Sequence, residues 1–129
     1  MQWQFDAQTP IYAQLVEQFT CRVLSGEYPP GSRAPAVREL AQEAQVNPNT
    51  MQRAFTELER QGLVFTQRTS GRFITEDTAL LGQLRQQKAA EALREFLEKM
   101  RQLGMQREEI LALLQQQKGE EHHGDDSAM

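Results

Sequence analysis

Apolar residues recur at helical spacing in two stretches near the start of the chain. The first stretch runs to about Leu24, and we expect Thr9 to cap this helix with Pro10 at its first position. Glycines and prolines at 25–31 end it. A second, shorter helix is expected over 36–44. The predicted inward-facing residues are Ile11, Leu15, Phe19, Val23, Val37, Leu40 and Ala41.

A third helix is expected to open at the pair Asn47-Pro48, which again places a capping residue before a proline. Gly62 follows its last apolar position and is typical of a residue just past a helix end. Two short runs rich in β-forming residues come next and indicate the strands of a hairpin, 63–66 and 72–75, with its tip at 67–71.

The helical period returns at Thr78 and continues to 103, where Gly104 ends the pattern. A last helix is expected from about Gln106, with Glu109 placed to bond back to the start of that helix. Residues 119–129 have no apolar pattern, and we expect a disordered acidic tail.

The predicted order is helix, helix, helix, strand, strand, followed by two further helices. This order indicates a mainly α fold with a small β-hairpin wing (α+β): a winged helix-turn-helix followed by a two-helix region. Ala41 is small enough for two steeply crossed helices to touch, and the linker 44–46 is short. Gln45 occupies a turn position where glycine is common.

The outward face of the third helix carries polar side chains that can hydrogen-bond base edges or phosphates, and 45–56 contains no acidic residue. The helix start at Asn47 adds the positive end of a dipole. The expected contacts on this helix are Asn47, Asn49, Thr50, Gln52 and Arg53. The alternative is an ordinary three-helix core with a polar surface.

The predicted hairpin tip places two arginines and two hydroxyls beside a glycine, which suits contact with a DNA backbone or a minor groove. The residues concerned are Arg68, Thr69, Ser70, Gly71 and Arg72. The alternative is a solvent-exposed polar hairpin.

Charge alone argues against nucleic acid, because the formal net charge is −4. Its distribution changes this view: 1–76 carries seven arginines against eight acids, whereas 77–129 carries seven basic side chains against ten acids. No apolar run is long enough to cross a bilayer and the first residues lack a signal-peptide pattern, so a cytoplasmic protein is expected.

The span 10–76 resembles the DNA-binding domain of the GntR family of regulators. The similar stretches are PIYAQLVEQF, then SGEYPPGSRAPAVRELAQEAQVNPNTMQRAFTELERQGLV, then GRFITED. The short two-helix end and the VNPNT at 46–50 are similar to the YtrA subfamily. The resemblance implies a DNA contact for Arg38, base or phosphate contacts for the third helix and a DNA-contacting wing tip.

Several positions depart from the family pattern, and these departures affect the operator sequence rather than the mode of binding. Ala34 and Ala36 replace the usual leucine and serine before VREL. Pro48 and Gln52 replace arginines of some branches, and Thr69 replaces a wing glycine.

The long helix from Thr78 carries an apolar stripe that a small winged domain cannot wholly cover, so we expect a twofold homodimer. Packing within the monomer is the alternative. The expected dimerisation residues are Leu81, Leu84, Leu93, Phe96, Leu97, Met100, Leu103, Ile110 and Leu114. The predicted domains are the DNA-binding domain, the helical dimerisation region and the tail: 9–77, 78–118 and 119–129.

The main hypothesis is a transcription regulator, expected to be a repressor, that binds double-stranded operator DNA of pseudo-palindromic sequence. The runner-up is a winged-helix module that binds protein or RNA. An enzyme is the least favoured class, and we expect no cofactor. His122 and His123 are expected in a solvated tail rather than at a metal site. A small-molecule effector could bind at the dimer or domain interface.

Overall fold

The computed structural model describes residues 2–117. The expected tail at 119–129, with His122 and His123, lies outside the described residues. The chain divides into two compact units, 1–85 and 86–129, so the division falls eight residues later than the predicted boundary between 77 and 78. No helix within 2–117 has both the length and the apolar character needed to cross a bilayer.

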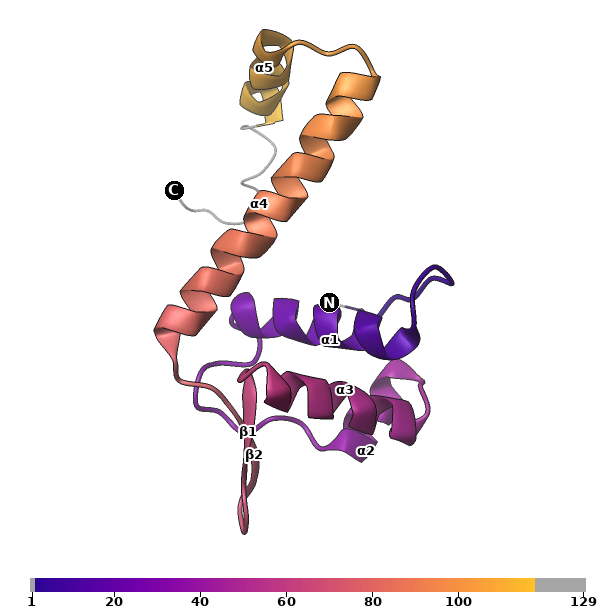
Figure 1. Ribbon diagram of the computed structural model, residues 1–129, viewed down its shortest axis with the longest axis vertical. Helices are drawn as coiled ribbons and strands as arrows, with labels where there is room; N and C mark the ends of the chain where they lie inside the picture. Colours follow the sequence, from indigo (N-terminus) through magenta and orange to yellow (C-terminus); the bar gives the residue numbers. More distant parts are fainter. Residues whose placement is uncertain (1, 118–129) are drawn as a thin grey trace. The chain divides into compact units, whose positions relative to one another are not determined.

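The first unit is built on three helices: α1 (Ile11–Leu24), α2 (Val37–Ala44) and α3 (Pro48–Arg60). Both α1 and α2 pack on α3 (Figure 1). The aromatic ring of Phe19 on α1 meets Phe55 on α3 edge to face, with 5.4 Å between the ring centroids. Most of the predicted inward-facing residues are in this core.

The helix ends show why these segments begin and end where they do. Asn47 caps α3 as predicted, because its side chain accepts a hydrogen bond from the backbone N–H of Asn49 at 2.7 Å. The prediction for α1 was wrong, since Pro10 itself is the capping residue and Thr9 supplies no cap. Gln45, with a φ of 59°, adopts the left-handed conformation between α2 and α3.

A two-stranded antiparallel hairpin follows, β1 (Val64–Gln67) and β2 (Gly71–Ile74), in a register that pairs Val64 with Ile74. The strands lie within one residue of their predicted bounds. The preceding segment 31–34 also pairs with β2, which the sequence did not indicate. Arg33 forms a β-bridge with Phe73, and its neighbours form flanking backbone hydrogen bonds. The outer edge of β2 is therefore paired with the segment 31–34 near the base of the hairpin.

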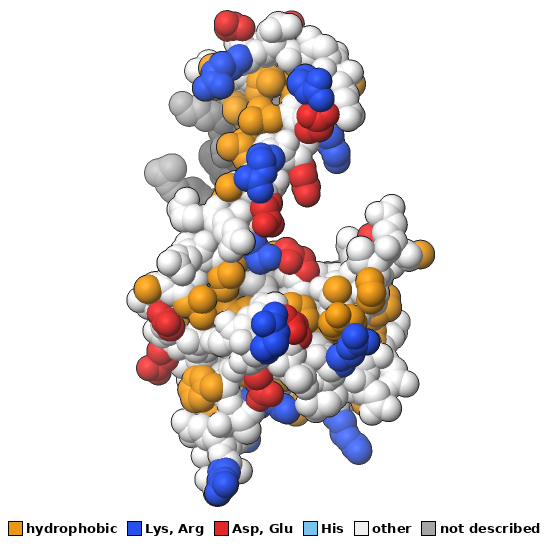
Figure 2. All heavy atoms as spheres, viewed as in Figure 1, with side chains coloured by type: hydrophobic (Ala, Val, Ile, Leu, Met, Phe, Trp, Pro, Cys, Tyr) orange, Lys and Arg blue, Asp and Glu red, His pale blue; other side chains and the backbone are white. Residues whose placement is uncertain are grey.

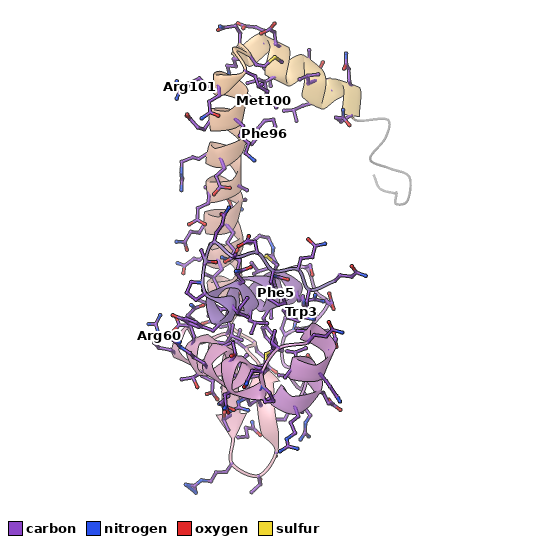
Figure 3. All side chains as sticks on the ribbon, turned by 90° about the vertical axis from the view of Figure 1, so that its right-hand side faces the viewer. Trp3, Phe5, Arg60, Phe96, Met100 and Arg101 are labelled. Carbon is purple, nitrogen blue, oxygen red and sulfur yellow. The ribbon has the colours of Figure 1, made fainter. Side chains whose placement is uncertain are left out.

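An N-terminal segment also packs on the first unit, although the predicted domain began at residue 9. Trp3 and Phe5 lie partly buried against the core (Figure 3). The indole N–H of Trp3 donates to Glu43 on α2, and the Trp3 ring lies over the guanidinium of Arg22 at 4.0 Å. This segment thus links α1 to α2.

Two further helices follow in the described residues, α4 (Thr78–Gln102) and α5 (Arg107–Gln117). Leu81 and Leu84, two of the residues predicted for a dimer interface, lie against the first unit. Leu81 is 5% exposed within the core of the first unit, and Leu84 packs against that core. Packing within the monomer, the alternative reading, therefore accounts for this first part of the apolar stripe.

In the second unit Glu109 accepts a hydrogen bond from the backbone N–H of Gln106, as predicted for the start of α5. Ile110 is only 8% exposed, so the monomer already buries most of this predicted interface residue. The labelled side chain of Phe96 points from α4 toward α5 (Figure 3). Large apolar side chains nevertheless remain exposed here: Leu93, Leu97, Leu103, Leu111, Leu113 and Leu114.

Candidate nucleic-acid interface

The start of α2, the exposed side of α3 and the hairpin border one open groove of about 640 Å³. Five of the predicted DNA-contacting residues line it together: Arg38, Gln52, Arg68, Gly71 and Arg72. Arg33 also lines it and was not among the predicted contacts. The segment before α2, α2 itself and the hairpin therefore place basic groups on one concave surface, to which α3 adds Gln52.

Most of these basic groups are available to an anion. Arg33, Arg38 and Arg68 are exposed, and none of them forms an ion pair with another residue of 2–117. Glu39 is the acidic residue that lines the groove. The space-filling view shows a basic side chain at the far end of the hairpin (Figure 2). The local surface is basic although the whole chain is acidic.

Arg72 differs from the other arginines because its guanidinium is already engaged. Its Nε lies 3.4 Å from a carboxylate oxygen of Glu59, and the group lies over the ring of Phe55 at 5.3 Å. Glu59 also accepts a hydrogen bond from the hydroxyl of Thr66. These contacts connect the base of the hairpin to α3, so Arg72 has a structural role in addition to any contact with DNA.

Another acid of α3 is also paired. Glu57 accepts hydrogen bonds from Arg60 (Nε to Oε1, 2.9 Å) and Gln61, and these bonds, led by Arg60, hold the pKa of its carboxyl down at about 2. The same bond raises the pKa of Arg60. Both acids of α3, Glu57 and Glu59, are therefore partnered by arginines, which limits their effect on an approaching polyanion.

The exposed face of α3 carries Asn49, Gln52 and Arg53, as the sequence predicted, while Thr50 is half-buried. The side-chain oxygen of Asn47 already accepts the capping hydrogen bond of α3. The guanidinium of Arg53 lies 3.7 Å from the centroid of the Tyr12 ring on α1. This contact could not be predicted, because Tyr12 lies in an ordinary amphipathic helix 41 residues earlier.

At the hairpin tip Arg68 and Thr69 are exposed and Ser70 is half-buried. The backbone N–H of Ser70 donates to the carbonyl of Gln67, which closes the turn. Gly71 follows with a φ of +101°, a conformation that L side chains rarely adopt. The guanidinium of Arg33 lies next to Gly71. In the sequence Arg33 is only an arginine just before the Ala34-Pro35 pair, and nothing there indicates a place in the groove.

The arrangement of exposed arginines and polar side chains can bind a polyanion. Residues 2–117 contain no group of three or more histidine, cysteine or acidic side chains able to hold a metal ion. Exposed arginines beside an exposed polar helix face are typical of surfaces that contact phosphates and base edges together.

Comparisons with known proteins agree with this geometry. The matching family model is described as "Bacterial regulatory proteins, gntR family" and covers residues 11–74. The "Uncharacterized HTH-type transcriptional regulator YhcF" of Bacillus subtilis is 41% identical over 84% of this chain and 89% of its own length. The HTH-type transcriptional repressor YtrA of the same species is 45% identical over 54% of this chain and 53% of its own.

Solved structures show the same fold. A GntR family transcriptional regulator from Listeria monocytogenes is similar with a TM-score of 0.78 and 37% identity, over 87% of this chain and 98% of that one. AraR(DBD) in complex with operator ORX1 is similar with a TM-score of 0.51 and 27% identity, over 56% of this chain and 93% of that one. The resemblance noted in the sequence is confirmed, and this chain belongs to the gntR family of bacterial regulatory proteins.

Proposed function

We propose that this regulator binds double-stranded operator DNA as a homodimer, with α3 in the major groove and the hairpin on the adjacent backbone or minor groove. The observation that carries the proposal is the groove in which exposed arginines from α2 and the hairpin flank the exposed polar face of α3. Arg38 and Arg68 contact phosphates, whereas Asn49, Gln52 and Arg53 reach base edges.

The comparisons support both the ligand and the sign of regulation. AraR(DBD), of the same fold, is seen on operator DNA, which supports a DNA ligand for the corresponding surface here. The relative YtrA is named a repressor, which supports repression through occupancy of the operator. Such a regulator acts where the chromosome lies, so we assign the protein to the cytoplasm.

The homodimer is proposed from the second unit alone. Its large exposed apolar side chains include Leu93, which is 55% exposed, and Leu114, which is 53% exposed. An apolar groove of about 330 Å³ lies between α4 and α5, lined by Phe96, Leu97 and Ile110 among others. Each such side chain gains roughly 1.5–3 kcal/mol when it is fully buried. A second copy of the same surface is the simplest cover, and its twofold axis matches a pseudo-palindromic operator.

The decisive experiment is selection of bound duplexes from a random pool, followed by fluorescence anisotropy with a selected and an unrelated duplex. We expect the full chain to prefer the selected duplex and to lose affinity steeply with added salt. Arg53→Ala should remove most of the preference, and Arg68→Ala should weaken binding to both duplexes alike. Equal affinity of the unchanged chain for both would favour the module that binds protein or RNA.

A further inference from the structure

We propose that Arg33 is a further DNA-contacting residue, and that Gly71 is the residue whose missing side chain lets Arg33 lie at the interface. The proposal rests on the proposed function, since it adds a residue to that DNA-binding surface.

The backbone of Arg33 is fixed to the hairpin. The β-bridge pairs Arg33 with Phe73. On either side, the N–H of Ile74 donates to the carbonyl of Ser32 at 2.8 Å, and the N–H of Ala34 donates to the carbonyl of Arg72 at 2.9 Å. The side chain of Arg33 therefore starts from a backbone that is paired with β2.

The guanidinium of Arg33 lies directly against Gly71. A Cβ atom built on Gly71 would be 2.9 Å from Nη2 of Arg33, which is closer than real contacts allow, and a tight 3.3 Å from Cζ, so the flexible end of the arginine would have to move. The group also lies 5.9 Å from the ring centroid of Phe73. The site beside Gly71 is thus occupied by a cation that any side chain at 71 would displace.

This cation has no carboxylate partner among the described residues, and its side chain is exposed in the groove that Arg38 and Arg68 also line. An exposed guanidinium without a carboxylate partner is suited to a phosphate, which it can bind through two parallel hydrogen bonds. We therefore assign Arg33 to a backbone phosphate rather than to a base, because its anchor lies on the hairpin and not on α3.

Gly26 provides a matched control for Gly71. Both have a positive φ, +92° and +101°, so an alanine strains the backbone at either position. A Cβ on Gly26 meets nothing within 4 Å, whereas one on Gly71 meets Arg33. Gly26→Ala thus carries the backbone strain without the displaced guanidinium.

The test measures binding of the full chain to a selected and an unrelated duplex over a series of salt concentrations. Arg33→Gln should lower affinity for both duplexes by a similar factor, about tenfold. It should also reduce the slope of log affinity against log salt by about 1 per subunit. Arg33→Lys, which keeps the charge, should retain most of the slope. Gly71→Ala should resemble Arg33→Gln, and Gly26→Ala should bind as the unchanged chain does.

A double-mutant cycle separates the two residues. In an Arg33→Ala background, Gly71→Ala should cause no further loss of affinity, because the guanidinium it would displace is gone. An equal loss in both backgrounds would overturn the role of Gly71, and an unchanged salt slope in Arg33→Gln would overturn that of Arg33. If the unchanged chain bound neither duplex, the proposed function itself would fail. That result differs from one in which the unchanged chain binds the selected duplex and the Arg33 variants bind it equally well.

Discussion

The guanidinium of Arg53 on α3 stacks on the ring of Tyr12 on α1, with 3.7 Å between the guanidinium carbon and the ring centroid. A stack of this kind uses the flat face of the guanidinium and leaves its N–H edges available to acceptors. It restricts the side chain before any ligand arrives, so less conformational freedom is lost on binding. Tyr12 therefore positions a residue of the proposed base-reading face from outside that face.

Replacing Tyr12 tests this arrangement. Tyr12→Leu should reduce the preference for a selected over an unrelated duplex several-fold, in line with a cation–π contact of about 0.5–1 kcal/mol at an exposed site. Tyr12→Phe keeps the ring and should restore the preference, a result that a general packing defect would not give. Anisotropy titrations with both duplexes measure the effect. Unchanged discrimination in Tyr12→Leu would exclude the positioning role.

Asn47 should contribute to stability through its cap rather than through DNA. Asn47→Ala removes the acceptor for the Asn49 N–H and should lower the free energy of unfolding by about 1 kcal/mol. Asn47→Asp keeps an acceptor and should preserve stability, yet it adds a negative charge at the DNA-facing end of α3 and should weaken binding. Urea denaturation and anisotropy on the same samples separate the effects. An Asn47→Ala protein as stable as the original would contradict the cap.

Replacing Glu27 should lower the free energy of unfolding more than replacing its partner Arg22, because the guanidinium of Arg22 is buried. Arg22 is 1% exposed; Nη1 lies 3.0 Å from Glu27, and its Nε and Nη2 have no hydrogen-bond partner in the structure. Glu27→Gln leaves a buried charge without its carboxylate and should cost about 1–3 kcal/mol. Arg22→Met should cost less, because the remaining Glu27 is 39% exposed and can be solvated. Denaturation midpoints would contradict this reasoning if Arg22→Met were the more damaging change.

Glu57 should make stability depend on acid pH. Its carboxyl has a pKa of about 2 when folded, against an ordinary value of 4.5. A pKa that is lower in the folded state stabilises the fold at pH values above 4.5, and this contribution is lost as the pH falls toward 2. Stability of the unchanged chain should therefore fall more steeply over that window than stability of Glu57→Gln. Parallel curves from denaturation at several pH values would argue against the pairing with Arg60.

The proposed homodimer should depend on the apolar groove of the second unit. Leu97→Glu places a charge in that groove and should convert a dimer into a monomer at micromolar concentrations in analytical ultracentrifugation. Phe65→Glu is the control, because Phe65 has the same 41% exposure as Leu97 but lies on β1. A monomeric unchanged chain, with and without DNA, would refute the dimer. A monomer stabilised by a small apolar ligand would assign the groove to an effector.

Local signals in the sequence predicted most of the fold. The pair Asn47-Pro48 predicted the start of α3, and Gly62, which has a φ of +84°, predicted its end. Such signals act between neighbours in the chain, so they can be read without knowing the fold. The burial of Leu81 within the first unit was not predicted, because the periodicity of α4 shows that a face is apolar but not what covers it.

The remaining features depend on contacts between distant residues. The approach of Arg33 to Gly71, of Tyr12 to Arg53, and of Trp3 to Glu43 each joins positions about 40 residues apart. No spacing rule connects such pairs, because their proximity follows from how the helices pack and how the segment 31–34 pairs with the hairpin. The candidate residues on α2, α3 and the hairpin could be predicted as a set. The residues that contact and position them, such as Tyr12 beside Arg53, could not.

The place of Trp3 has a practical consequence. It is the single tryptophan of the chain, and its indole is bonded to α2 while its ring covers Arg22 of α1. Tryptophan emission of the protein therefore originates at the junction of these two helices, and any movement of α2 could be followed without an added dye. For the same reason an affinity tag is better not joined to the N-terminus, which lies two residues from Trp3.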